Sequence, residues 1–334
     1  MSSALKEIAK RSKTAIIAFK TYDNWRLKQR FKNGDPEWVD GSTHLHLSIE
    51  ESLAYINWQY DDYLQYGELT PDELRGKRIF ELGFGDNIGV PLKFLSICEA
   101  QQVVCLDKFY ATRDEEQHRK IYLALRDTLS EEEKGRFDEV VDLSGGIQLN
   151  PERLQCIYGV DVENAPQLAN VEPFDLIVSR GAVQDIYEPD AAFAAMDRML
   201  ARGGLSMHKI DLSDQKIFTN SGLHPLTFLT ISEPVYRRMA IDSGRPNRKP
   251  ARYYRQKMKE LGYESKILIT EVIGRSGMGD LMPHRETIER GPDFVESALK
   301  AVSEIRPRLR PEFRDLPDEE LIFGGIFLIA RKPN

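Results

Sequence analysis

Four residues in the first third of the chain have the types and spacing to bind a nucleoside. Glu81, Gly83 and Gly85 form an ExGxG pattern, and Asp107 follows 22 residues after Gly85. Glycine reaches backbone angles that are closed to other residues and lets a ligand approach the main chain. An acid at the end of the following strand can accept hydrogen bonds from the two hydroxyls of a ribose. The pattern therefore predicts a nucleoside-binding unit.

The elements that must position these residues follow from the surrounding sequence. Residues 78–83, RIFELG, are a short apolar run ending in an acid and a glycine, as expected where a buried parallel strand enters a tight turn. A helix is expected after Asn87, with its first main-chain amides directed at the ligand. Residues 101–107, QQVVCLD, predict a second strand that ends on Asp107.

The details favour S-adenosyl-L-methionine over a dinucleotide. A dinucleotide fingerprint is GxGxxG, but the third glycine, Gly89, comes one residue late. Glu81 would repel a pyrophosphate, whereas it suits the positively charged amino-acid end of S-adenosylmethionine. The alternative is that a glycine-rich turn between strand and helix is only a turn. Acids at both ends of the pattern favour the binding interpretation.

These motifs resemble the first two motifs of the class I methyltransferases, which use S-adenosylmethionine. The order FDLIVS, helix, LxxGG and strand over residues 174–212 resembles the fourth and fifth motifs. The resemblance implies an α/β, Rossmann-like fold with a seven-stranded, mostly parallel sheet flanked by helices. In many relatives a histidine stands where this chain has Asp185, which leaves the task of Asp185 open.

The resemblance also implies a set of cofactor-binding residues. An acid just after the third strand, expected at residues 154–161, commonly meets the adenine amino group, and Asp161 has this place, with Val162 beside the ring. Asp161 could equally cap the turn before Glu163. The predicted cofactor-binding residues are Glu81, Gly83, Phe84, Gly85, Asn87, Asp107, Lys108, Asp161, Val162, Ser179 and Arg180.

Methyl transfer to an alcohol requires a general base within hydrogen-bond reach of the oxygen. The polar residues expected at the carboxyl ends of the fourth and fifth strands are Asp185, His208, Asp211 and Asp214. We predict His208 as the base, with Asp185 or Asp211 orienting it or the acceptor. Two observations oppose this assignment. A lone histidine in an apolar strand is often a core residue, and alternation places His208 and Asp211 on opposite faces unless the strand has ended.

The remaining segments predict additions to this fold. Residues 1–74 are expected to form an N-terminal helical extension or lid, and residues 75–334 the methyltransferase domain. Insertions are expected at about 212–250, after the fifth strand, and at 275–319, between strands at 263–274 and 320–332. The helix closed by Gly203 and Gly204 is expected to run from Pro189.

Aromatic and basic residues in the additions are candidates for substrate binding. Leu53, Ile56, Tyr60 and Tyr63 make one helix face; this face either packs on the domain or supplies tyrosines as walls for a polar ring. His224, Arg248 and Arg252 lie in or next to the first insertion. The arginines could grip a carboxylate or phosphate, although solvated arginines are common.

The first 35 residues are basic, with Leu5, Ile8, Ala9, Ile16, Ile17 and Phe19 among lysines and arginines. A basic amphipathic helix can lie on an anionic membrane surface. The plainer interpretation is a helix that packs on the body of the protein or on a second subunit, and the sequence leaves a homodimer open.

Composition excludes several classes of protein. Hydrophobic residues make up 41% and charged residues 30% of the 334 residues, as in an ordinary globular protein, and the net charge of −7 argues against nucleic acid as a partner. No apolar run approaches the ~20 residues that span a bilayer, and the N-terminus lacks a secretory signal, so we expect a cytoplasmic protein. Three isolated cysteines indicate reduced thiols. His44 and His46 could share one side of a strand, but no third ligand is near, and we expect no metal.

The acceptor is predicted from a family-level resemblance. The combination of ELGFGDNIGVPLKFL, CLDKF, HKIDLSD and a late NR...RYY resembles bacterial methyltransferases of surface-polysaccharide and other sugar-modifying gene clusters. It implies a small-molecule or glycan-precursor acceptor that is methylated on a hydroxyl. The alternatives are O- or C-methylation of a secondary metabolite and a non-catalytic binding protein that keeps the cofactor fold.

Overall fold

The computed structural model describes residues 12–35, 37–38, 42–165, 172–273, 282–283 and 292–334. The chain divides into two compact units, each built from separate segments. The Glu81 unit contains residues 34–180, 191–207 and 331–334, and the Asp185 unit contains residues 1–33, 181–190 and 208–330. Leu5, Ile8 and Ala9, and parts of the predicted insertion at 275–319, lie outside the described residues.

The Glu81 unit is organised around four parallel strands. They are β2 (Arg78–Leu82), β3 (Gln102–Asp107), β7 (Leu154–Tyr158) and β8 (Phe174–Arg180), in the order β8-β2-β3-β7. Of these four strands, β2 comes first in the chain and lies inside the sheet: β3 and β7 follow on one side of it, and β8 lies on the other side. Ligands of open α/β sheets bind at such a switch point, beyond the carboxyl ends of the strands. The turn after Leu82 begins there.

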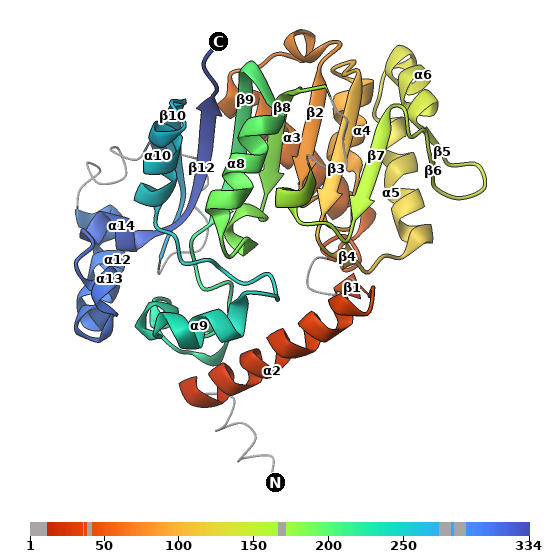
Figure 1. Ribbon diagram of the computed structural model, residues 1–334. Coiled ribbons are helices and arrows are strands. Elements are labelled where there is room, and N and C mark those ends of the chain that lie inside the picture. The colour runs from red at the N-terminus through yellow and green to blue at the C-terminus, as the bar shows by residue number, and fades with distance from the viewer. Residues whose placement is uncertain (1–11, 36, 39–41, 166–171, 274–281, 284–291) are drawn as a thin grey trace. The chain divides into compact units, whose positions relative to one another are not determined.

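Helices flank these strands on both faces, with α3 and α4 behind them and α8 in front in the view of Figure 1. The helices are α3 (Ile49–Gly67), α4 (Gly89–Ser96), α5 (Glu115–Asp127), α6 (Glu131–Val140) and α8 (Pro189–Met199), of which residues 189–190 belong to the other unit. Side-chain oxygens of Ser48, Asp114 and Ser130 accept main-chain N–H groups at the starts of α3, α5 and α6. Short strands β1 (Glu37–Trp38) and β4 (Tyr110–Ala111) pair with each other, as do β5 (Val141–Asp142) and β6 (Gln148–Leu149).

The Asp185 unit holds the C-terminal strands and most of the added helices. Its strands are β10 (Glu264–Val272), β11 (Met282–Pro283) and β12 (Phe323–Arg331), in the order β11-β10-β12-β9. Its helices are α2 (Lys13–Lys32), α9 (Glu233–Ala240), α10 (Ala251–Glu260), α12 (Pro292–Ile305), α13 (Pro311–Arg314) and α14 (Asp318–Ile322). Strand β9 (Leu200–Asp211) belongs to both units, since residues 200–207 fall in the Glu81 unit and residues 208–211 in the Asp185 unit.

The predicted α/β, Rossmann-like fold with a mostly parallel sheet is confirmed, with the two-residue β11 as an additional edge strand. One boundary was wrong. The helix predicted to end at Gly203 and Gly204 ends at Met199, and both glycines lie within β9. Gly203 has a φ of +70°, and a Cβ on Gly204 would lie 2.8 Å from the carbonyl oxygen of Ala201. Gly203 therefore adopts a backbone angle that favours glycine, and Gly204 leaves room for the carbonyl of Ala201. Within the described residues no helix is long and apolar enough to span a bilayer.

Candidate functional site

The turn between β2 and α4 leaves its main chain bare at two positions. Gly83 and Gly85 both lie in the left-handed region, with φ angles of 73° and 63°. The N–H of Gly83 donates to the carbonyl of Leu106 at 2.8 Å, so the turn starts while still paired with β3. A side chain at either glycine would strain this backbone. The turn therefore keeps main-chain atoms accessible at the switch point of the sheet.

Glu81 is a buried acid directly before this turn. Glu81 pairs with Cys105 of the neighbouring strand β3, and the residue is 5% exposed. The sulfur of Cys105 lies 4.0 Å from Glu81 Oε2. Among the residues that the structure describes, no lysine, arginine or histidine forms an ion pair with it. Burial, followed by the charge of Asp107, raises the pKa of Glu81 to about 8. A cationic ligand would stabilise the charged form of this carboxyl group.

Asp107 ties the end of β3 to the glycine turn. Its Oδ2 accepts the N–H of Gly85 at 3.1 Å, and its Oδ1 accepts the N–H of Phe109 at 3.0 Å. Burial raises the pKa of Asp107 to about 6, while these two hydrogen bonds and the charge of Arg113 oppose the shift. Each carboxylate oxygen has two lone pairs, so the group can still accept hydrogen bonds from ribose hydroxyls.

An arginine and three aromatic rings cluster around the same turn. The rings of Phe84 and Tyr110 both lie 5.0 Å from that of Tyr158, measured between centroids. Arg113 lies 4.9 Å above the Tyr158 ring, bonds its hydroxyl, and donates to the carbonyl of Gly85 at 3.2 Å. The sequence analysis assigned no role to Arg113, Tyr110 or Tyr158. The sequence showed only that Tyr158 lies near the end of the expected third strand; its register with Asp107 is seen in the structure.

Lys108 and Asp161, both predicted to bind the cofactor, are brought together in an ion pair of 2.9 Å. Asp161 precedes the short 3-10 helix Val162–Asn164, but its side chain makes no capping hydrogen bond there. Asp161 stands at the N-cap position of this turn, where its carbonyl oxygen accepts the N–H of Asn164 at 3.0 Å, but its side chain does not cap. Val162 is buried beside it.

At the end of β8, Ser179 is fully buried, and Arg180 forms an ion pair with Asp62 of α3. The Arg180 guanidinium donates to Asp62 at 2.8 Å and lies 4.0 Å from the centroid of the Trp58 ring. Both partners of the ion pair are close to nine-tenths buried, so it fixes the end of β8 on α3. Asp62 and Trp58 were not predicted as site residues.

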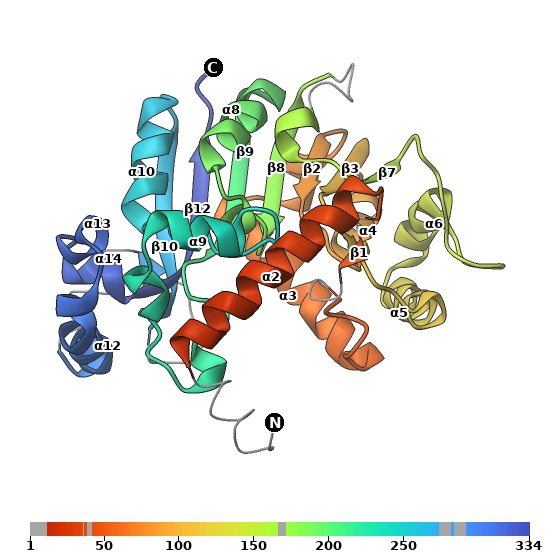
Figure 2. The same ribbon diagram turned by 60° about the horizontal axis from the view of Figure 1, so that its bottom comes forward.

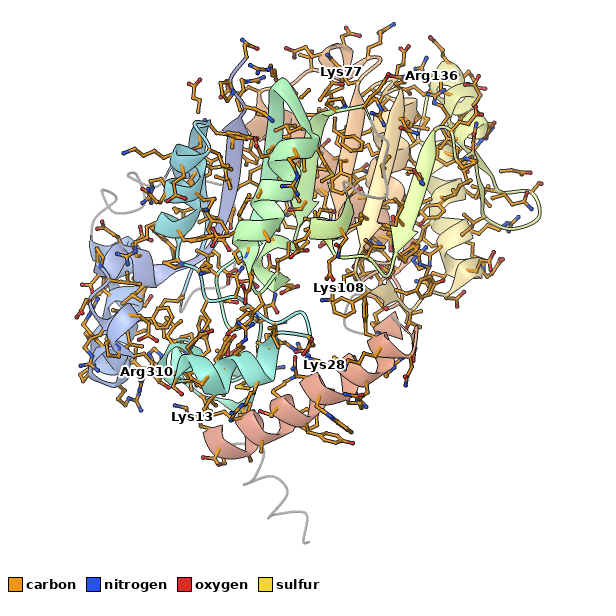
Figure 3. The ribbon with its side chains drawn as sticks, in the orientation of Figure 1. Lys13, Lys28, Lys77, Lys108, Arg136 and Arg310 are labelled. Atoms are coloured by element: carbon orange, nitrogen blue, oxygen red, sulfur yellow. The ribbon has the colours of Figure 1, made fainter. Side chains whose placement is uncertain are left out.

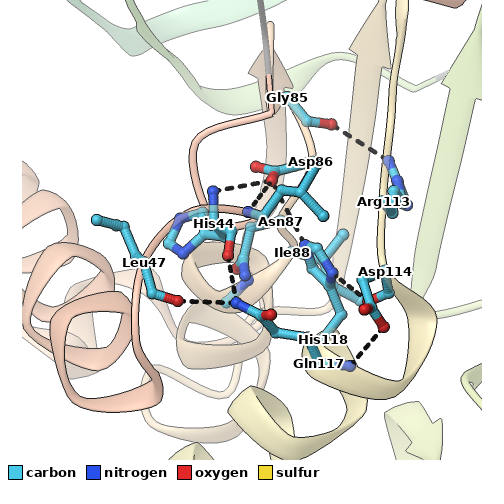
Figure 4. A network of polar contacts seen from close by, with 12 residues as sticks. His44, Leu47, Gly85, Asp86, Asn87, Ile88, Arg113, Asp114, Gln117 and His118 are labelled. Atoms are coloured by element: carbon cyan, nitrogen blue, oxygen red, sulfur yellow. Dashed lines mark hydrogen bonds and ion pairs between the residues drawn. The ribbon is translucent and has the colours of Figure 1, made fainter. Parts of the chain in front are cut away.

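The segment before α3 is anchored to the glycine turn by Asp86, as Figure 4 shows. Asp86 Oδ2 accepts the main-chain N–H groups of His44 at 2.8 Å and Leu45 at 3.1 Å. Gln117 of α5 donates to the carbonyls of His44 and Leu47, each at 2.8 Å. These contacts hold residues 42–48 against the turn.

The same segment corrects the expectation of a strand at His44 and His46. Both residues lie in an irregular turn, where His44 is buried and His46 is exposed. Among the described parts of the chain, no three His, Cys, Asp or Glu side chains are grouped so as to hold a metal ion.

In the Asp185 unit, polar groups gather around the loop that follows β8. Gln215 Nε2 donates to Asp185 Oδ1 at 2.7 Å, and the N–H of Asp211 donates to Gln184 Oε1 at 3.3 Å. Gln215 and Lys216 are consecutive non-glycine residues in the left-handed region, with φ angles of 47° and 62°. Such strain is found preferentially at functional sites.

Asp214 holds this strained turn in place. Its carboxylate accepts the N–H groups of Lys216, Phe218 and Thr219 and the hydroxyl of Thr219, at 2.7 to 3.0 Å. The carboxylate is 2% exposed and has four donors, which is a structural role. Asn247 anchors the loop from the other side, because its Nδ2 donates to the carbonyls of Val183 and Ile186 at 3.1 and 3.0 Å.

The environment of His208 does not support its predicted role as general base. The side chain is fully buried, and burial lowers its pKa to about 3. A group with so low a pKa is a weak base at neutral pH. Strand β9 continues without a break to Asp211, so alternation places His208 and Asp211 on opposite faces.

The predicted substrate-binding residues are mostly occupied by contacts within the fold. Tyr60 and Tyr63 are buried beside Phe94, and the Tyr60 hydroxyl lies 3.0 Å from the Cys98 sulfur. Their packing is that of core residues and gives no support to a tyrosine lid; the alternative of a helix face packed on the domain is the one observed.

The three basic candidates lie in the Asp185 unit. Both ring nitrogens of His224 are bonded, to the Ala301 carbonyl and the Leu226 N–H. The buried Arg248 guanidinium donates to the carbonyls of Phe228 and Ile231 and to Glu233. Arg252 is exposed, and its main-chain N–H bonds Glu320. His224 and Arg248 therefore have their hydrogen-bonding groups committed within the protein.

The residues of the Glu81 unit fit S-adenosylmethionine. The fit rests on a buried carboxyl group with a raised pKa and no cationic partner among the described residues, next to two left-handed glycines. Glu81 would face the charged amino-acid end, the main chain of Gly83 to Gly85 would lie along the molecule, and Asp107 would accept the ribose hydroxyls.

No protein-family model and no curated protein matches the chain. Among solved structures, it is similar to phosphoethanolamine N-methyltransferase 2 of Haemonchus contortus in complex with S-adenosyl-L-methionine, with 16% identity, a TM-score of 0.41, and coverage of 83% of this chain and 52% of that one. The chain is also similar to the YcgJ protein of Bacillus subtilis, with 13% identity, a TM-score of 0.39, and coverage of 84% of this chain and 98% of that one. A further similar structure is the CurJ carbon methyltransferase, with 10% identity, a TM-score of 0.37, and coverage of 80% of this chain and 51% of that one. The chain spans about half the length of the Haemonchus contortus enzyme. Likenesses at this level do not establish an activity.

Proposed function

We propose that the chain is an S-adenosylmethionine-dependent methyltransferase. One observation carries the proposal: Glu81 is a buried acid with a pKa raised to about 8, directly before a turn whose two glycines are in the left-handed region. In a dinucleotide site this carboxylate would face a pyrophosphate of the same sign. When bound, S-adenosylmethionine supplies a methyl group on a positively charged sulfur.

The raised pKa of Glu81 gives this proposal a signature that a simple binding curve lacks. At neutral pH the carboxyl group of the free protein holds its proton, because its pKa is about 8. A cation beside it stabilises the ionised form, so binding must release a proton. Calorimetric titration with S-adenosylmethionine at pH 7, in two buffers of different ionisation enthalpy, measures this release.

Two matched variants test whether the released proton comes from Glu81. We expect Glu81→Gln to bind more weakly and to release no proton, whereas Glu139→Gln, an acid of the same unit with a 66% exposed side chain, should behave as the wild type. S-adenosylhomocysteine keeps the amino-acid end and should also release the proton. No binding of either compound would reject the methyltransferase proposal, and binding without proton release would reject the assigned role of Glu81.

We further propose a hydroxyl of a sugar or glycan precursor as the acceptor, with Asp185 in place of His208 as the base in an in-line displacement. Asp185 Oδ1 accepts a hydrogen bond from Gln215 at 2.7 Å, which fixes the orientation of the carboxyl group. The acceptor hydroxyl would lose its proton to this carboxylate, and the neighbouring amide of Gln215 would keep the carboxylate oriented.

A methyl-transfer screen tests the acceptor. Nucleotide sugars and glycans are compared with phenolic acids, with transfer of radioactive methyl groups as the readout. Transfer to a sugar hydroxyl supports the proposal, and transfer only to phenols would reject it. Binding of S-adenosylmethionine with no transfer to any acceptor class would favour a binding protein that keeps the cofactor fold.

A further inference from the structure

Helix α2 carries three large aromatic side chains in solvent. Phe19, Tyr22 and Trp25 are 60%, 59% and 55% exposed. They follow one another at intervals of three residues, which places them on neighbouring turns of one helix face, and the rings of Tyr22 and Trp25 lie 5.9 Å apart. Single exposed apolar residues are normal, but three in a row on one face indicate an interaction surface. We call Phe19, Tyr22, Trp25 and the cations beside them the outer face of α2.

The opposite face of α2 is already used within the Asp185 unit. Ile16 and Leu27 are buried, and Figures 1 and 2 both show α2 lying along α9. The side chain of Asn24 donates to Asp242 at 3.3 Å and accepts the Asp242 N–H at 2.8 Å. Lys13 donates to Thr230 at 2.5 Å. The helix is therefore fixed to its unit by one face, and the aromatic stripe is not needed for that attachment.

The charged residues of α2 are positive with one exception. Asp23 is the sole acid of the helix; it is 9% exposed, bonds Arg26 at 2.8 Å and lies 3.8 Å from Arg245. All other charged residues of α2 are lysines and arginines. Arg26 and Lys32 are exposed, whereas Lys20 lies on the helix face of Ile16 and Leu27, with its Nζ 5.6 Å from the centroid of the Phe19 ring. Lys28, labelled in Figure 3, is also exposed and forms an ion pair of 3.2 Å with Asp242.

This local charge is opposite to that of the whole chain. The first 35 residues contain nine lysines and arginines and three acids, whereas the complete chain has a net charge of −7. A negatively charged surface would therefore be attracted to the outer face of α2 and repelled by the rest of the protein, which selects the orientation of docking.

We propose that the outer face of α2 docks on the surface of an anionic lipid bilayer. Aromatic rings with basic neighbours suit the boundary between headgroups and acyl chains, where Trp and Tyr are enriched and lysines extend toward the phosphates. Aromatic side chains at this depth would hold the helix at the membrane surface without crossing the bilayer. A second copy of the chain is a poorer occupant, since two outer faces would bring cations together.

Vesicle binding of the full chain tests the proposal. We expect co-sedimentation with phosphatidylcholine vesicles that contain phosphatidylglycerol and little or none with phosphatidylcholine alone, and a loss of binding at high salt. The variant Phe19→Ser/Tyr22→Ser/Trp25→Ser should lose binding by about tenfold or more. The variant Arg26→Gln/Lys28→Gln/Lys32→Gln should lose it to a similar extent. The matched control Lys259→Gln/Lys300→Gln/Arg310→Gln removes three exposed cations elsewhere in the same unit and should bind as the wild type.

A spectroscopic readout separates docking from general attraction of charges. With Trp38→Phe and Trp58→Phe, Trp25 is the one tryptophan left, and its emission should shift to the blue and resist quenching by acrylamide when anionic vesicles are added. Equal binding to neutral and anionic vesicles, or unchanged binding by both triple variants, would overturn the proposal. So would self-association that the aromatic triple variant abolishes while vesicles are not bound, since the occupant would then be a second copy. All of these results are independent of S-adenosylmethionine binding.

Discussion

The N–H of Gly85 donates a hydrogen bond to the carboxylate of Asp107, with 3.1 Å between nitrogen and oxygen. The turn after β2 is thereby tied to the end of β3, in addition to the hydrogen bond from the N–H of Gly83 to the carbonyl of Leu106. A change at Asp107 must affect both the shape of the turn and the group that would accept the ribose hydroxyls.

We expect Asp107→Asn to weaken binding of S-adenosylmethionine by about tenfold or more, because hydrogen bonds to a charged acceptor are worth about 1.5–3 kcal/mol. Calorimetry measures the loss. The exposed Asp72→Asn variant, which removes an acid with an 86% exposed side chain, serves as the control and should bind normally. Unchanged affinity of Asp107→Asn would place the ribose elsewhere.

Affinity should also depend on pH through Glu81. Its pKa of about 8 in the free protein means that, at lower pH, a bound cation must first displace the proton. We expect the dissociation constant to fall by up to about tenfold per unit of rising pH and to level off above pH 8. In Glu81→Gln this slope should vanish. A wild-type profile that is flat between pH 6 and pH 8 would contradict the assignment.

Whereas affinity should rise with pH, the folding stability of the ligand-free protein should fall with pH because of Glu81. The unfolded chain ionises Glu81 near the usual pKa of 4.5, whereas the folded chain keeps the proton up to about pH 8. The free energy of unfolding therefore falls as the pH rises through this window. We expect Glu81→Gln to unfold at a higher temperature than the wild type at pH 8, and the difference to shrink toward pH 4.5. Thermal unfolding at several pH values provides the measurement, and a lower melting temperature of the variant at pH 8 would refute the expectation.

His208 should matter for acid stability more than for turnover. The unfolded chain takes up a proton at His208 below the usual pKa of 6.5, whereas the folded chain does so only near pH 3. Stability from this residue is thus present above pH 6.5 and is lost as the pH falls toward 3. We expect His208→Gln to have a flatter unfolding profile on the acid side and, where it folds, to keep methyl transfer within about tenfold of the wild type. Loss of all transfer in a well-folded variant would restore His208 as a base.

Gln215 is predicted to orient the proposed base, Asp185. Removing its hydrogen bond of 2.7 Å in Gln215→Ala should lower kcat by about tenfold, with KM for S-adenosylmethionine unchanged. Gln256→Ala is the matched control, since that glutamine also donates to a carboxylate, Glu260, but on α10. A fall in kcat accompanied by an equal loss of thermal stability would indicate a structural role only, and an unchanged kcat would remove Gln215 from the mechanism.

The strands, the glycine turn and its flanking acids could be predicted from the sequence because each is a local pattern. Apolar runs ending in Glu81 and Asp107 predicted β2 and β3, and the glycines predicted the turn. The contacts that complete the site are not local. Arg113 meets Tyr158 across 45 residues, and Arg180 meets Asp62 across 118. Burial of a side chain also could not be predicted from the sequence. His208 has the residue type and the position expected of a base, and its pKa is lowered only because the side chain is packed in the core.

Asp86 gives a practical warning about shortening the protein. Residues 42–48 precede α3 and look dispensable when the strands alone are considered, yet they supply two of the N–H groups that solvate the buried carboxylate of Asp86. A chain trimmed to begin at Ile49 would leave that charge without these donors, a few residues from Gly85. The turn of Gly83 and Gly85 would then lose its support from the segment before α3. The inactivity of such a shortened protein would wrongly be taken as evidence against an enzyme.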